Sequence, residues 1–201
     1  MSTDSGPTVP CSATTPGTAA SDTAASDTAA SGAAAQETAT RDTAAPDESP
    51  SQGGKATLHV AELGDIPPRT LYEILRLRVD AFVVEQEAAY ADLDGLDSAP
   101  GTELHWAQRE DQVLATLRLL RGATLQIGRV VAAPAARGTG IAAEIMDRAM
   151  RRCTELEPGA PVILNAQEPL TGWYARFGFE PSGERYLEDG IAHIPMTAWP
   201  S

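Results

Sequence analysis

The spacing of apolar and polar residues predicts strands and helices along most of the chain after residue 56. An alternation of period two, typical of half-buried strands, marks residues 57–62, 103–109, 112–120 and 124–132. Short polar turns separate the last three segments, so we expect them to form an antiparallel meander. The 124–132 segment ends in a continuous apolar run, which predicts a central place for it in the sheet.

Two segments have the helical period instead. After Pro67-Pro68, Thr70 and Glu73 have the spacing of a capping box, and four apolar residues share one helical face: Leu71, Leu75, Val79 and Phe82. From Ile141 onward, apolar residues recur every three or four positions against charged ones. Cys153 falls on that second apolar face, so we expect it to be a buried thiol.

The remaining elements complete a single domain over residues 56–201. Residues 161–166 predict a short buried strand, residues 168–178 a shorter helix, and two further strands flank the turn Asp189-Gly190. The order of elements predicts an α+β fold. We expect a mixed, mostly antiparallel central sheet flanked by helices.

Residues 1–55 form a low-complexity segment rich in Ala, Ser, Thr and Asp, with SDTAA repeated at 21–30. Residues 1–54 contain one valine and, after Met1, no Leu, Ile, Phe, Tyr or Trp. Ordering such a segment costs backbone entropy that no apolar burial offsets. We therefore predict a disordered tail before the domain.

The net charge of −13 limits the classes of partner. The tail has seven acidic residues against Arg41, and the chain has one lysine, Lys55. This balance lacks the electrostatic footprint of nucleic-acid or anionic-membrane binding, whereas a cationic or amine-bearing partner fits it. No apolar run of 18 residues and no signal-peptide pattern is present, so we expect a cytoplasmic protein, monomeric or homodimeric. Cys11 and Cys153 suggest neither a disulfide framework nor a metal cluster.

Residues 87–101 predict an acidic loop near the end of the first helix, because turn formers accompany Asp92, Asp94 and Asp97. The DxDGxD run is similar to part of a calcium loop, but the EF-hand glycine and glutamate are not at the required spacing. We expect a solvated loop that faces substrate, with calcium binding as the alternative and no metal in the leading hypothesis.

The segment ARGTGIAA, residues 136–143, places two glycines at the start of the second helix. A turn of this kind presents backbone N–H groups to an anion. A P-loop is excluded because neither glycine precedes a lysine. Gly138, Gly140 and Ala143 do satisfy the dinucleotide pattern G-x-G-x-x-A. Three features oppose that reading: residues 133–137 separate the strand from the glycines, the next strand ends in Asn165 with no acid for a ribose, and too few strands remain.

Arg137-Gly138-Thr139-Gly140-Ile141-Ala142 resembles the Q/R-x-x-G-x-G/A motif of the GNAT N-acetyltransferases. Twenty-five residues later, QEPLTGWYARFGFEP resembles the second signature of that family. The segments LRLRVDAFVVEQ, YADLDGLD, IGRV and YLEDGIAHIPM are similar to the ElaA-like branch of the superfamily. The resemblance covers about residues 57–199.

The resemblance implies acetyl-CoA as acyl donor, and the chemistry of the turn agrees with it. Consecutive N–H groups of the glycine turn suit a pyrophosphate: Arg137, Gly138, Thr139, Gly140, Ile141, Ala142 and Ala143. By the resemblance, the backbone of Val130, Val131 and Ala132 pairs with the pantetheine arm. Gln167 occupies the place where many members have an asparagine that contacts the cofactor.

Acetyl transfer needs a neutral amine, a polarised carbonyl and a proton for the leaving thiolate. The resemblance gives the proton-donor role to Tyr174, whose alternative is ordinary helix packing beside Trp173 and Phe177. The candidates for the base are Glu85, His105 and the loop carboxylates, with deprotonation through water equally open. By the same resemblance, we expect four residues on the substrate side: Asp92, Asp94, Arg129 and His193. Arg129 either binds a substrate carboxylate or pairs with a loop aspartate.

The sequence therefore favours an N-acetyltransferase that moves acetyl from acetyl-CoA to a small-molecule or peptide amine by direct attack in a ternary complex. A non-catalytic acyl-CoA-binding or regulatory module of the same fold is the alternative. A third hypothesis is an interaction protein in which the tail is the working part.

Overall fold

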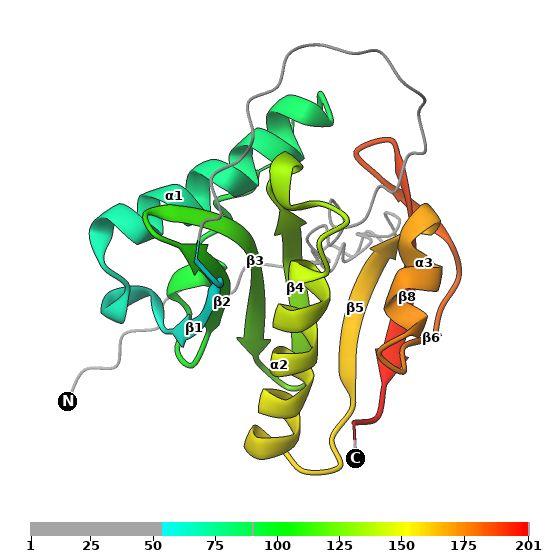
Figure 1. Cartoon of the computed structure of the whole chain (residues 1–201). Helices are drawn as coiled ribbons and strands as arrows, with labels where there is room; N and C mark the ends of the chain where they lie inside the picture. The colour runs from blue at the N-terminus through cyan, green and yellow to red at the C-terminus, as the bar shows by residue number, and fades with distance from the viewer. Residues whose placement is uncertain (1–53, 90, 201) are drawn as a thin grey trace, which may run out of the picture.

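The computed structural model describes residues 54–89 and 91–200 (Figure 1). Almost all of the predicted tail, residues 1–55, lies outside these described residues. The strands are β1 (Thr57–Ala61), β2 (Glu103–Arg109), β3 (Gln112–Arg121), β4 (Leu125–Ala132), β5 (Val162–Gln167), β6 (Glu180–Pro181), β7 (Tyr186–Glu188) and β8 (Ile191–Ala198). The α-helices are α1 (Pro68–Val79), α2 (Ile141–Leu156) and α3 (Thr171–Ala175). Within the described ranges, no helix combines the length and the apolar composition that a membrane crossing needs.

One sheet contains these strands in the order β1-β2-β3-β4-β5-β8-β6, with β7 paired to β8. β1 to β4 pair antiparallel, which confirms the predicted meander. β4 and β5 are parallel and pair at two positions, Leu125 with Val162 and Gln126 with Ile163. Beyond these positions the two strands diverge (Figure 1). The predicted mixed, mostly antiparallel sheet is confirmed.

Side chains alternate between the two faces of the sheet, and each face has its own apolar core. α2 and α3 cover one face, where Met146 and Tyr174 share a buried cluster with Ala107 and Leu117. α1 covers the opposite face with a second cluster that includes Trp106. Helices therefore cover both faces of the sheet.

α1 differs from its prediction in start and orientation. It begins at Pro68 with Pro67 as the N-cap and no side-chain cap, so the expected capping box of Thr70 and Glu73 is wrong. Proline at the first helical position needs no N–H acceptor, which allows the earlier start. The fully buried face contains Ile74 and Leu77 rather than Leu75 or Val79, because Arg78 is also drawn inward. A π-helical segment, η2 (Asp80–Glu85), continues α1.

α2 spans the predicted amphipathic segment. Its buried residues include Ile141, Ile145 and Met146, as the helical period predicted. Cys153 is fully buried on the same face. Burial raises the pKa of the Cys153 thiol to about 12, with the charges of Glu103 and Glu157 acting in the same direction. The prediction of a buried thiol is confirmed.

The C-terminal segment is more divided than predicted. The expected helix over 168–178 is a 3-10 turn, η5 (Glu168–Leu170), followed by the five-residue α3. After α3, Phe177 and Gly178 donate to carbonyls three residues back, and Gly178 has a φ of 85°, which ends the helix. Three strands follow instead of the predicted two. The additional strand is the two-residue β6, which precedes β7 in the chain and also pairs with β8.

Candidate active site

The glycine turn leads directly into α2. Gly138 (φ 74°) and Gly140 (φ 86°) are both left-handed, and Gly140 is the N-cap of the helix. Residues with a β-carbon rarely adopt such angles. A β-carbon on either glycine would meet no atom within 4 Å. Glycine is therefore required here for backbone conformation, and the space beside the turn is open to a ligand.

The N–H groups at the start of α2 suit an anion. The first turn of any α-helix has N–H groups without acceptors in the same helix, and here they belong to residues from Ile141 onward. The positive end of the helix dipole lies at the same place. Thr139 Oγ1 donates to the Ala136 carbonyl at 2.7 Å, which fixes the turn. The arrangement can hold a phosphate without a lysine.

The second half of β4 has a strand neighbour on one side. Ala132 and Val131 pair with Ala115 and Thr116 of β3. On the other side, the described ladder with β5 stops at Gln126. The backbone of residues 130–132 therefore has an edge that faces the divergence of β4 and β5. The predicted pairing of this edge with a pantetheine arm stays a prediction.

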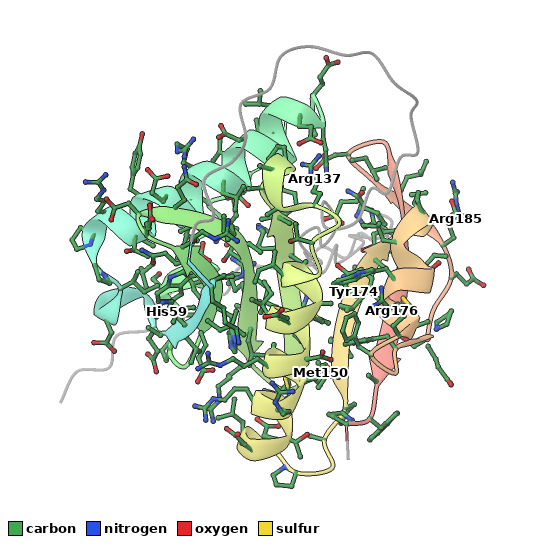
Figure 2. The ribbon with its side chains drawn as sticks, viewed as in Figure 1. His59, Arg137, Met150, Tyr174, Arg176 and Arg185 are labelled. Atoms are coloured by element: carbon green, nitrogen blue, oxygen red, sulfur yellow. The ribbon has the colours of Figure 1, made fainter. Side chains whose placement is uncertain are left out.

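Tyr174 and Gln167 lie on the β5 side of the same divergence. Tyr174 of α3 (Figure 2) is fully buried. Its ring packs edge-on against Trp173 at a centroid distance of 4.9 Å. This contact is the packing that was one of its two predicted roles. Gln167 is the last residue of β5, and its side-chain amide donates to Gln86 Oε1 at 3.3 Å.

Arg137 connects the glycine turn to the end of the first helix. Its guanidinium binds both carboxylate oxygens of Glu85, with distances of 2.7 and 2.5 Å. The hydrogen bond and charge of Arg137 lower the pKa of Glu85. A carboxylate stabilised in this way is a weaker base, so the pairing weakens the candidacy of Glu85 for proton removal.

Comparison with known proteins identifies the family to which this fold belongs. A model of the acetyltransferase (GNAT) domain matches residues 73–199. The chain belongs to the GNAT family. Protein ElaA of Escherichia coli K12 is 39% identical over 147 residues, which cover 70% of this chain and 92% of ElaA. This GNAT protein is therefore ElaA-like, as its motifs predicted.

Two solved structures share the architecture of this GNAT domain. An acyl-CoA N-acyltransferase from Pseudomonas aeruginosa has a TM-score of 0.68 and 40% identity, covering 72% of this chain and 99% of its own. The crystal structure of Escherichia coli ElaA has a TM-score of 0.68 and 33% identity, with the same coverage of both chains. This protein therefore resembles an acyl-CoA N-acyltransferase both in fold and in sequence.

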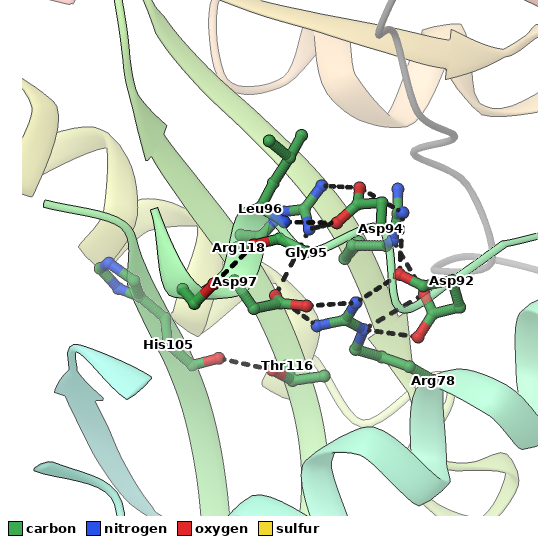
Figure 3. A network of polar contacts seen from close by, with 11 residues as sticks. Arg78, Asp92, Asp94, Gly95, Leu96, Asp97, His105, Thr116 and Arg118 are labelled. Carbon is green, nitrogen blue, oxygen red and sulfur yellow. Dashed lines mark hydrogen bonds and ion pairs between the residues drawn. The ribbon is translucent and has the colours of Figure 1, made fainter. Parts of the chain in front are cut away.

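The acidic loop of the GNAT domain folds onto buried arginines. We call the six residues involved the Arg/Asp cluster: Arg78, Arg118, Arg129, Asp92, Asp94 and Asp97 (Figure 3, which labels all of them except Arg129). The Arg78 guanidinium lies at the centre, with Nε 3.0 Å from Asp92 Oδ2 and Nη1 2.7 Å from Asp97 Oδ1. Its side chain is completely buried. The expectation of a solvated loop is wrong at these positions, because the arginines supply buried partners.

Asp94 joins the other two arginines of the cluster. Its carboxylate accepts from Arg118 at 2.7 and 2.8 Å and from Arg129 at 2.8 Å. Burial opposes ionisation of Asp94, but Arg118 outweighs it, so the pKa of Asp94 lies below its ordinary value. Arg129 has a φ of 54° at a bulge in β4, which turns its side chain towards the loop. Pairing with a loop aspartate is therefore the alternative that Arg129 adopts.

These contacts bear on two predictions. Direct contact of Asp92, Asp94 or Arg129 with substrate stays a prediction, although each side chain already has ionic partners. Among the described residues, no group of three acidic, His or Cys side chains could hold a metal ion. Sequence reasoning missed Arg78 and Arg118; the arginine inside the apolar run QVLATLRLL was the signal that a buried carboxylate must face it.

His105 lies apart from the glycine turn. It is buried on β2 and faces a pocket of about 660 Å³ beside Arg148 and Arg152 of α2. β3 and β4 stand between β2 and β5, which is about 14 Å at the usual strand spacing. The structure therefore does not bring His105 to Tyr174, and its role as the base is an unsupported prediction.

The carboxylate of Glu103, beside His105, makes the stability of the fold depend on pH in the acidic range. His105 Nε2 lies 3.5 Å from Glu103 Oε2, and Arg152 binds the same carboxylate at 2.7 Å. Together these groups lower the pKa of Glu103 to about 2. The folded-state pKa is depressed, so the stabilisation is complete above the unfolded pKa of about 4.3 and is lost as the pH falls towards 2.

Replacing Glu103 by Gln is expected to flatten this part of the pH dependence. The free energy of unfolding, measured with urea between pH 2 and 6, should fall less steeply in Glu103→Gln than in the wild type. Glu155→Gln is the control, because the exposed Glu155 contacts the same Arg152 at 3.3 Å. Equal slopes for all three proteins would remove Glu103 as the source.

A pair of substitutions at Gly140 is expected to separate charge from conformation at the glycine turn. Asn and Asp have nearly the same shape and both tolerate left-handed backbone better than other residues, but only Asp adds a negative charge. Gly140→Asp should weaken acetyl-CoA binding at least tenfold more than Gly140→Asn, because the charge repels a phosphate. Isothermal titration with acetyl-CoA measures both; equal affinities would show that no phosphate binds there.

Proposed function

We propose that this protein transfers an acetyl group from acetyl-CoA to a primary amine by direct attack in a ternary complex. The observation that carries the proposal is the left-handed glycine turn at the N-terminus of α2, beside the divergence of β4 and β5. The turn suits a pyrophosphate, and the free edge of β4 suits an extended chain of amides. Acyl-CoA is a ligand that has both groups in one molecule.

The acyl donor is proposed to lie on the face of the sheet that α2 covers. Its pyrophosphate meets the N–H groups from Gly138 to Ala143, and its pantetheine amides pair with the backbone of Val130, Val131 and Ala132. This places the thioester near Ala132, whose N–H can polarise the carbonyl. Gln167 lies across from that edge at the end of β5.

The acceptor is proposed to be an amine that needs no carboxylate for recognition. The guanidinium of Arg129 is already bound by Asp92 at 2.8 Å and Asp94 at 2.8 Å, so it is committed within the Arg/Asp cluster. The chain also has a net charge of −13, which favours approach of a cation. Polyamines, lysine side chains and peptide N-termini all meet this description.

Tyr174 is proposed to protonate the leaving thiolate. A phenol with a pKa of about 10 is protonated at neutral pH and can donate to a thiolate whose acid has a pKa near 8.5. The ring is fixed by its contacts with Trp173 and Phe179, which gives the hydroxyl a defined position. An immobilised donor loses little entropy on reaching the transition state.

Thiol release from acetyl-CoA tests the function directly. The wild-type protein should release CoA with at least one amine from a panel of peptides, lysine and polyamines. Binding of acetyl-CoA without thiol release from any amine would favour the non-catalytic acyl-CoA-binding module. Absence of binding, judged by no rise in melting temperature at saturating acetyl-CoA, would remove the assignment of the glycine turn.

A further inference from the structure

His193 has a polar atom that the fold buries and leaves without a partner. The residue is 1% exposed, and its Nε2 has no hydrogen-bond partner in the part of the chain that the structure describes. A buried polar atom without a hydrogen bond lowers the free energy of unfolding, so its presence in a fold calls for an explanation. His193 lies on β8, where it pairs with Gln167, the last residue of β5.

The other ring nitrogen fixes which form of the imidazole is present. Nδ1 lies 3.0 Å from the Ile191 carbonyl oxygen, which can only accept a hydrogen bond. Nδ1 must therefore carry the proton in the neutral ring, and Nε2 has the free lone pair. The orphaned atom of His193 is the basic one.

The strand register places His193 near the level of the proposed reaction centre, opposite Val130 and two residues before Ala132 on β4. From the paired residues Leu125 and Val162, five further residues along each strand lead to Val130 and Gln167. His193 is the antiparallel partner of Gln167. Ile194 packs with the α2 core, so by alternation the His193 side chain lies on the opposite face of the sheet. That face is the one opposite the proposed path of the acyl donor.

The charged and titratable neighbours come from β7, its turn and β4. Tyr186 of β7 stacks on the imidazole at a centroid distance of 5.8 Å and remains partly exposed. Glu188 lies beside Tyr186. Burial and the charge of Asp189 raise the pKa of Glu188, and the charge of Arg129 opposes them. Burial lowers the pKa of His193, which the Ile191 carbonyl and Asp189 oppose. The ring is therefore neutral, and able to accept a proton, at neutral pH.

We propose that His193 is the general base of the transfer reaction, with Nε2 taking a proton from the acceptor ammonium directly or through one water. The nitrogen lone pair so released forms the C–N bond with the thioester carbonyl carbon. The C–S bond breaks, the sulfur leaves with its electron pair and takes the Tyr174 hydroxyl proton. The tyrosinate then takes the second proton of the acylated nitrogen, and the imidazolium loses its proton to water. The inference rests on the proposed function.

The alternative bases are less suited by position or by partner. Glu85 is held by two guanidinium nitrogens of Arg137, Nη1 and Nη2, and His105 lies on the face that α2 covers. Asp92 and Asp94 are held in the Arg/Asp cluster. His193 Nε2 has no such competing partner among the described residues.

The pH dependence of His193→Asn tests the proposal. Asn keeps a donor for the Ile191 carbonyl but lacks Nε2. With the panel amine that the wild type acetylates fastest, kcat/KM of the variant at pH 7 should fall by about 10²–10⁴-fold. It should then rise about tenfold per pH unit and approach the wild type near the amine pKa of about 10, because only the free amine reacts. The wild type should instead be flat above the pKa of His193.

Two further measurements keep the outcomes separate. His193→Ala should regain activity with added imidazole, which a purely structural residue would not do, and acetyl-CoA should raise the melting temperature of every variant as it does that of the wild type. Nitrogen-15 NMR of the histidines in the wild type should show the Nδ1–H form of His193. An Nε2–H form, or a His193→Asn profile within threefold of the wild type, overturns the base. Failure of the wild type on every amine overturns the transfer function and this role with it.

Discussion

Replacing Asp92 by Asn is expected to lower the free energy of unfolding by about 3–5 kcal/mol, the usual cost of leaving a buried charge uncompensated. The Asp92 side chain is 2% exposed and lies between Arg78 and Arg129, both completely buried. Asn has the same shape but no charge, so three buried guanidinium groups would share two carboxylates. Urea denaturation of the two proteins measures the difference.

The exposed ion pair between Arg76 of α1 and Asp80, the C-cap of that helix, provides the control. Asp80 lies 3.4 Å from Arg76, and both side chains are more than half exposed. Surface pairs of this kind contribute about 0–1 kcal/mol, so Asp80→Asn should leave the unfolding free energy nearly unchanged. Equal effects at Asp80 and Asp92 would show that the Arg/Asp cluster does not stabilise the fold through its buried charges.

Replacing Tyr174 by Phe is expected to reduce kcat by about 10²–10⁴-fold, the typical contribution of general acid catalysis. The substitution removes one hydroxyl and keeps the ring that packs against Trp173 and Phe179. Affinity for acetyl-CoA should change much less, because its phosphate and pantetheine contacts are assigned to other residues. Steady-state thiol release and isothermal titration measure the two quantities separately.

Tyr72→Phe is the matched control, since Tyr72 is 65% exposed on α1. It should turn over at the wild-type rate. If Tyr174→Phe does the same, the hydroxyl only packs and another group protonates the thiolate. Provided that chemistry limits turnover, the alkaline limb of kcat in the wild type should also disappear in Tyr174→Phe. A limb that persists belongs to another group or to the acceptor amine.

Local sequence signals were sufficient for the elements that depend on near neighbours. The alternation of residues 103–132 predicted β2, β3 and β4 because each strand buries one face and its turns are short. Gly138 and Gly140 predicted a turn at the start of α2, and both adopt left-handed backbone, a conformation that depends on the residue itself. The same signals predicted α2, its buried cysteine and the family of the chain.

The start of α1 shows how weak such signals become when two are in conflict. Thr70 and Glu73 matched a capping box, but Pro67 and Pro68 had already set the backbone for a first turn. The buried face of α1 contains Ile74 and Leu77 instead of Leu75 and Val79 because of a contact with a distant part of the chain. Arg78 points inward to meet Asp92 and Asp97, carboxylates that the chain supplies from a loop 14 and 19 residues later.

The sequence by itself determined the sheet, the glycine turn and the set of polar residues available to the site, because periodicity and backbone preference are properties of short segments. Only the tertiary structure decided what those polar residues do. It paired Arg129 with the acidic loop, tied Glu85 to Arg137 and kept His105 on β2, with β3 and β4 between it and β5. Ionic partners and strand register join residues distant in the chain, so the side chain that each one meets depends on the packing of the whole domain.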